Sequence, residues 1–91
     1  DKGEAVRALL RLLPPDVPGL TVGLGDAAND LPMLQAVDRP IVMPRPGGAL
    51  DPTLAAALPH AERARAAGPG GWAAAVLDVL AGESLPKVGA R

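Results

Sequence analysis

The chain has 91 residues, a formal net charge of −1 and no cysteine, and Trp72 is its one aromatic residue. This length allows one domain at most. A balanced charge without a basic run argues against a nucleic-acid-binding surface, and no apolar run approaches the ~20 residues that span a membrane. The absence of cysteine excludes disulfides and thiolate metal sites, and it agrees with the cytoplasmic location that we expect.

The first half of the chain predicts a helix, a strand and a second helix. Apolar residues between Val6 and Leu13 follow the i, i+3, i+4, i+7 spacing of a helix, which two prolines then end. Residues 20–25 alternate apolar with small residues, as a short strand does. After a polar turn, residues 31–37 predict a short helix with Pro32 in its first turn.

The second half predicts shorter elements separated by loops rich in glycine and proline. Asp51 followed by Pro52 is typical of a helix start, and Gly82 is typical of a helix end. The composition of residues 60–67 leaves both a helix and a strand open. In order, we expect a strand at 41–43, a helix at 51–58, either a helix or a strand at 60–67, and a helix at 72–81. A loose tail should follow at 83–91.

This alternation of helices and strands indicates an α/β fold with parallel strands and helical crossovers. A parallel sheet is normally covered by helices on both faces. Two or three short strands are few for such a sheet, and we expect this chain hardly to cover two faces. The sequence therefore predicts one part of a larger α/β fold.

The polar turn at residues 25–30 is the main candidate site. It follows a predicted strand directly and precedes a helix, and ligands of open α/β sheets bind at such strand ends. Asp26 and Asp30 offer carboxylate oxygens, the ligands that Mg²⁺ takes together with water and phosphate. The alternative is structural, because Asn29 or Asp30 would also serve as the N-cap of the next helix. Two carboxylates so close repel each other unless a cation or a donor lies between them, which favours a metal.

Other polar residues carry weaker signals. Lys2 could neutralise a phosphate group, although an isolated lysine is more often solvated. Arg45 lies in a loop after a strand, where a substrate anion could reach it. Trp72 is more typical of a core anchor than of a ligand-stacking residue. The chain has one histidine and one serine, far apart in sequence, so a serine–histidine triad or a zinc site is not expected.

Several segments of the chain resemble the haloacid dehalogenase-like phosphatases. Residues 1–3 (DKG) and 22–34 (VGLGDAANDLPML) resemble the third and fourth motifs of that superfamily. Residues 37–38 (VD), 41–43 (IVM) and 68–77 (GPGGWAAAVL) resemble the end of the mannosyl-3-phosphoglycerate phosphatases within it. The resemblance runs from Asp1 to about Leu80, nearly the whole chain.

The resemblance implies a Rossmann-like parallel sheet of the haloacid dehalogenase type with flanking helices, of which residues 1–82 would be the C-terminal part. It also implies Mg²⁺ as cofactor and a small phosphorylated sugar as substrate, attacked by an aspartate to give an aspartyl-phosphate. By this resemblance Asp26 holds the metal, and Asp30 is its partner, directly or through water. Asn29 would hydrogen-bond near the transferring phosphoryl group, and Lys2 would neutralise its charge.

The chain also departs from the family pattern. The first motif, Asp-x-Asp-x-Thr, the second-motif serine or threonine and the cap domain are absent. We therefore expect half of a catalytic centre, completed by a missing N-terminal part of the same fold and inactive alone. The alternatives are another Cof-type sugar phosphatase or a non-catalytic remnant that keeps the turn as a helix cap. The phosphorylation domain of a cation-pumping ATPase is less compatible with residues 31–34.

Overall fold

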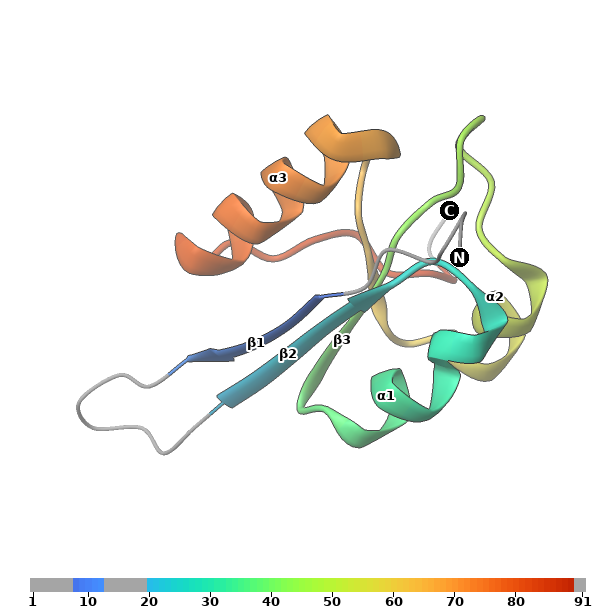
Figure 1. Ribbon diagram of the computed structural model, residues 1–91, viewed down its shortest axis with the longest axis horizontal. Helices are drawn as coiled ribbons and strands as arrows, with labels where there is room; N and C mark the ends of the chain where they lie inside the picture. Colours follow the sequence, from blue (N-terminus) through green and yellow to red (C-terminus); the bar gives the residue numbers. More distant parts are fainter. Residues whose placement is uncertain (1–7, 13–19, 90–91) are drawn as a thin grey trace.

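A four-stranded mixed sheet forms the centre of the protein. The computed structural model describes residues 8–12 and 20–89. The strands lie in the order β1-β2-β3-β4, with β2, β3 and β4 parallel and β1 antiparallel to β2 (Figure 1). The predicted α/β class with a partial parallel sheet is therefore confirmed. The strands are β1 (Ala8–Leu12), β2 (Leu20–Gly25), β3 (Arg39–Val42) and β4 (Glu62–Arg63).

The predicted helix at residues 6–13 is wrong for β1, which forms a strand. β1 pairs with β2 along its whole length, from Ala8 opposite Leu24 to Leu12 opposite Leu20. A short apolar run satisfies a helix template and a strand template almost equally well. The free edge of β2 decides between them, because its backbone groups gain hydrogen-bonding partners when β1 lies beside it.

The described helices begin where proline follows a turn. Pro32, Pro52 and Pro69 each occupy the first or second helical position, where a missing N–H costs nothing. The last helix therefore starts at Gly68, four residues before the predicted start, and it ends before Gly82 at a φ of 78°. None of the helices in the described part of the chain combines the length and the hydropathy of a membrane span. The helical elements are η1 (Ala28–Asp30), α1 (Leu31–Ala36), α2 (Pro52–Ala57) and α3 (Gly68–Leu80).

Helices cover both faces of the parallel strands, contrary to our expectation. Figure 1 shows α3 on one side of the sheet and α1 and α2 on the other. Ile41 and Met43 face the α3 side, whereas Val42 between them faces the α1 and α2 side. This alternation of side chains builds two separate cores from one strand. Val79 of α3 belongs to the core with Ile41 and Met43, and Leu54 of α2 belongs to the core with Val42.

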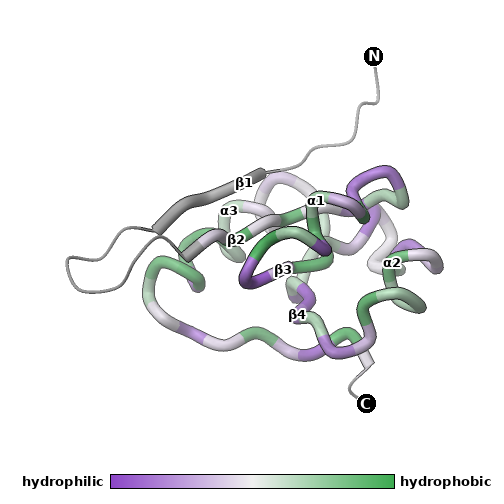
Figure 2. The backbone as a smooth tube through the Cα atoms, turned by 90° about the horizontal axis from the view of Figure 1, so that it is seen from below, coloured by the Kyte–Doolittle hydropathy of each residue, from purple (hydrophilic) through white to green (hydrophobic). Residues whose placement is uncertain are grey.

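The described part of the expected loose tail, residues 83–89, is packed against the protein. The Val88 N–H donates to the Ala61 carbonyl at 2.7 Å, and the Arg63 N–H donates to the Pro86 carbonyl at 2.7 Å. Leu85 is buried in the core under α3. Figure 2 shows this segment leading from the end of α3 past β4 to the C-terminus. The tail is therefore ordered because it supplies β4 with hydrogen bonds and the core with a leucine.

Candidate active site

The polar turn lies at the carboxyl edge of the parallel strands. β2 ends at Gly25, and its carbonyl accepts a hydrogen bond from the N–H of Met43 at 2.8 Å. This bond holds the end of β2 beside the end of β3, so Asp26 and the loop that begins at Pro44 leave the sheet at the same edge. In open α/β sheets this edge is where ligands bind.

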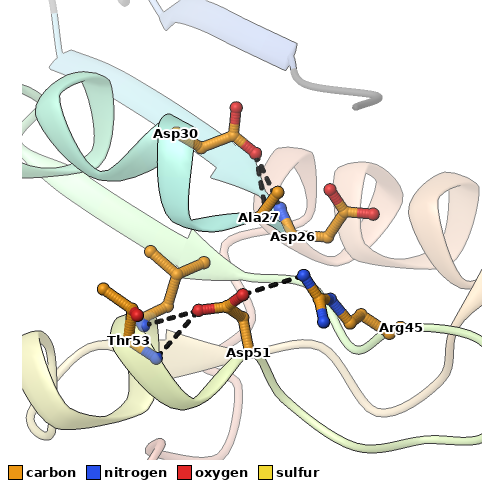
Figure 3. Close-up of polar contacts among 7 residues, drawn as sticks. Asp26, Ala27, Asp30, Arg45, Asp51 and Thr53 are labelled. Carbon is orange, nitrogen blue, oxygen red and sulfur yellow. Dashed lines mark hydrogen bonds and ion pairs between the residues drawn. The ribbon is translucent and has the colours of Figure 1, made fainter. Parts of the chain in front are cut away.

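Asp30 closes the turn from inside. Its side chain is fully buried, and Oδ2 accepts hydrogen bonds from the N–H of Asp26 at 3.0 Å and of Ala27 at 3.1 Å (Figure 3). It precedes α1 but makes no side-chain cap bond to that helix. The expected N-cap role is therefore replaced by a backward contact that fixes the backbone of the turn.

Gly25 leaves the room that Asp30 needs. A Cβ atom at residue 25 would lie 2.6 Å from the Cβ of Asp30 and 2.8 Å from its Oδ2. Contacts this short force either the backbone or the carboxylate to move. The glycine in the Gly-Asp-x-x-Asn-Asp sequence is thus explained by the side chain five residues later.

Asp26 is a partly buried carboxyl group with one unpartnered oxygen among the described residues. Its Oδ1 is buried and has no hydrogen-bond partner among the described residues. Burial raises the pKa of Asp26, and the negative charges of Asp30 and Asp51 raise it further, although Arg45 opposes them. A carboxylate in this position is stabilised by a cation or by a donor from a ligand.

The described residues offer a partial ligand set for Mg²⁺. They contain no group of three or more histidine, cysteine or acidic residues that could hold a metal ion together. Mg²⁺ typically binds one or two protein carboxylates and fills its other positions with water and phosphate oxygens. The unpartnered oxygen of Asp26 fits such an ion, whereas Oδ2 of Asp30 is already used by two backbone donors.

A third acidic residue at this edge, Asp51, holds the loop after β3. Asp51 is buried, and its Oδ1 caps α2 by accepting from the N–H of Thr53 at 2.8 Å and of Leu54 at 3.1 Å. Its Oδ2 accepts from Nη2 of Arg45 at 2.8 Å (Figure 3). The cap was predicted from the Asp-Pro pair. The pairing with Arg45 was not, because no local pattern links an arginine to a cap six residues later.

The structure brings together part of the predicted site. Asp26 and Asp30 lie in one turn, and Asn29 lies exposed in η1 between them. Lys2 lies outside the described residues. The roles of all four side chains toward a metal or a phosphate therefore stay predictions.

Curated relatives of this chain are phosphatases. It is 42% identical over 81 residues to a glucosyl-3-phosphoglycerate/mannosyl-3-phosphoglycerate phosphatase of Methanococcoides burtonii. The aligned region covers 88% of the chain and 29% of that protein. It is 51% identical over 47 residues to a protein of the same name from Persephonella marina. This aligned region covers 48% of the chain and 17% of that protein. No protein-family model matches the chain, and no solved structure matches it. The chain thus spans less than a third of the length of these relatives.

Proposed function

We propose a role in phosphate-ester hydrolysis for this chain. The chain is homologous to one segment of the glucosyl-3-phosphoglycerate/mannosyl-3-phosphoglycerate phosphatases. The sequence resemblance predicted this relationship. In this proposal the chain supplies one half of a Mg²⁺-dependent site that hydrolyses a sugar phosphate monoester. Mannosyl-3-phosphoglycerate, converted to mannosylglycerate, is the proposed substrate because the relatives carry its name. The aspartate nucleophile and a cap domain would come from outside residues 1–91.

One observation carries the proposal: Asp26 holds a buried oxygen without a hydrogen-bond partner among the described residues, at the carboxyl edge of the sheet. A carboxylate oxygen that is removed from water without gaining a hydrogen bond costs free energy. Such an oxygen is therefore expected where a ligand supplies the compensating positive charge. Bound Mg²⁺ would neutralise that carboxylate and polarise the phosphoryl group. Asp26 would hold the ion at the point where the substrate phosphate enters.

The neighbouring residues would divide the remaining work. Asp30 would fix the backbone of residues 26 and 27, and so the direction of the Asp26 side chain, with any contact to the metal made through water. The exposed Asn29 amide would donate a hydrogen bond to a phosphate oxygen. Lys2 would balance phosphate charge, and the cytoplasm is the proposed compartment.

A second function, a purely structural turn, is favoured by one specific observation. Asp30 satisfies two backbone N–H groups, which is a sufficient reason for an acidic residue at that position. That observation does not explain Asp26, whose buried Oδ1 has no hydrogen-bond partner among the described residues. The two functions therefore differ in what they require of Asp26 alone.

The test is Asp26→Asn in the complete enzyme that contains this segment. The amide keeps the size of the side chain and removes its charge, so we expect Mg²⁺-dependent phosphate release to fall by at least about 10²-fold, the loss of one electrostatic contact to the reacting group. Asp78→Asn, the same change on α3, is the matched control and should keep wild-type activity. Near-normal activity of Asp26→Asn would support the structural turn instead.

A further inference from the structure

A small cavity lies directly beside Asp26. It has a volume of about 290 Å³, and three parts of the chain form it: the end of β2, the loop after β3 and the start of α3. This volume lies just below the range for drug-sized small-molecule sites, roughly 300–1,000 Å³. It would take one ring-sized group and would exclude a polymer. The lining residues are Asp26, Pro44, Pro46, Gly68, Pro69 and Trp72.

The chemistry of this cavity is uneven. Asp26 is its one charged lining residue, whereas three proline rings and the Trp72 indole present C–H and aromatic surface. Proline has no N–H to donate, so these walls offer few hydrogen bonds. A matching ligand has a charged or reacting group at one end and a C–H-rich face at the other.

Trp72 is suited to form the wall of such a site. It is half-buried, packs against the core under α3 and also lines the cavity. The expected role as a core anchor is thus correct for one part of the indole and incomplete for the other. An indole held by the core keeps a fixed orientation, so a ligand that stacks on it does not have to order it first.

We propose that this cavity binds the glycosyl group of the phosphate ester, with one C–H face of a pyranose ring stacked on Trp72. The negative face of the indole attracts the weakly positive C–H groups of such a ring, as it attracts the edge of another aromatic ring. The proposal rests on the proposed function, because Asp26 then places the phosphate at the mouth of the same cavity. Trp72 acts here as a binding residue for the group that is not transferred.

The first experiment uses the wild-type 91-residue chain and needs no substitution. The chain has one tryptophan and no tyrosine, so its fluorescence reports on Trp72 alone. Methyl α-mannopyranoside or methyl α-glucopyranoside should change this fluorescence, and saturation-transfer NMR should show magnetisation reaching the ring C–H protons. Mannitol, which has hydroxyl groups but no ring, should do neither. Absence of both signals with the pyranosides would overturn the proposal, whether or not the enzyme hydrolyses phosphate esters.

The second experiment measures selectivity in the complete enzyme. Trp72→Ala should lower kcat/KM for mannosyl-3-phosphoglycerate relative to acetyl phosphate, which has no ring, by about three- to tenfold, the range of one aromatic contact. We expect this change in Trp72→Ala to lie in KM. The Trp72→Phe variant keeps an aromatic ring, so its selectivity should stay close to that of the wild type. Leu77→Ala, an exposed site on the same helix, should leave the ratio unchanged.

The outcomes separate the two proposals. An unchanged ratio in Trp72→Ala, with both substrates affected equally, would mean that Trp72 supports only the fold. If the wild-type enzyme released no phosphate from mannosyl-3-phosphoglycerate or from acetyl phosphate, the proposed function would fail. The pyranoside signals on the chain would still decide whether the cavity binds a sugar ring.

Discussion

Asp30 shows how one buried side chain shapes the candidate active site. Its Oδ2 accepts two backbone hydrogen bonds, and its Cβ occupies the space that a side chain at residue 25 would need. Asp26 is therefore held by a residue that solvent does not reach. The missing side chain at position 25 and the carboxylate at position 30 together fix the backbone that carries Asp26.

Gly25→Ala should disturb this arrangement. The new methyl group would meet Asp30 at 2.6–2.8 Å, so we expect a loss of about 1–3 kcal/mol in the free energy of unfolding, as for other overpacked sites. Urea denaturation followed by Trp72 fluorescence would measure it. Gly70→Ala is the control, since a Cβ there meets nothing within 4 Å and should leave stability unchanged or slightly raised. Equal stability of both variants would contradict the close contact.

Asp51→Ala should weaken α2 and release Arg45 at once. Loss of an N-cap costs about 0.5–2 kcal/mol, and the buried position of Asp51 favours the upper half of that range. Asp51→Asn keeps the capping oxygen and removes the charge that pairs with Arg45. We therefore expect the asparagine variant to retain most of the stability in thermal denaturation. If Asp51→Asn were as unstable as Asp51→Ala, the stabilisation would come from the ion pair with Arg45 and not from the helix cap.

Sequence predicted these residues but not their atomic roles. The spacing of Asp26 and Asp30 was visible, because both belong to one short pattern after a strand. Which carboxylate faces a ligand depends on the backbone of the turn, and no spacing rule contains that. Trp72 and Asp26 line one cavity although they lie 46 residues apart in the chain, and this depends on how α3 lies on the sheet.

Among the secondary-structure elements, β4 is short and is held by neighbours on both sides. It has two residues, pairs with β3 on one side and receives the tail on the other. Glu62 of β4 accepts from Nε and Nη2 of Arg39 at 2.6 and 2.9 Å, and from the N–H of Leu85 at 2.8 Å. One carboxylate thus joins β3, β4 and the tail.

Stability at acidic pH should report on this junction. Burial alone would raise the pKa of Glu62, but the hydrogen bonds from Arg39 and Leu85 outweigh it, and the pKa lies below its ordinary value of 4.5. The unfolded chain then binds a proton that the folded chain does not, so the stabilisation is complete above pH 4.5 and is lost as the pH falls through the folded-state pKa.

Glu62→Gln provides the comparison. At neutral pH it should reduce the free energy of unfolding by about 1.5–3 kcal/mol, the size of hydrogen bonds to a charged group. Below pH 4.5 its stability should fall less steeply than that of the wild type, so the two curves converge. Urea midpoints measured across this range would test it, and parallel curves would exclude Glu62 as the responsible group.

The same elements explain what sequence could and could not predict. β2 and α2 were predicted because their signals are local: an apolar strand, and an Asp-Pro helix start. β1 was missed because its apolar run satisfies both templates and only pairing with β2 decides. The packed tail was missed because Leu85 and its hydrogen bonds lie about 20 residues from their partners on β4.

At the scale of the whole molecule, helices cover both faces of the parallel strands, but the outer side of α3 is not covered among the described residues. Each face of these strands carries a core. The outer side of α3 still exposes Leu77 at 65% and Leu80 at 61%. Their i, i+3 spacing places them side by side on the helix.

This pair of leucines should promote self-association of the 91-residue chain. Burying a leucine gives about 1.5–3 kcal/mol, so two adjacent ones on each copy supply a driving force that scattered single residues lack. The Leu77→Gln/Leu80→Gln double variant should lower the average mass in sedimentation velocity without changing helical content by circular dichroism. Ala74→Gln, at another exposed position of α3, should leave the mass distribution as in the wild type. If the double variant sedimented like the wild type, association would have to arise elsewhere, and the open side of α3 would be stable in water without a partner.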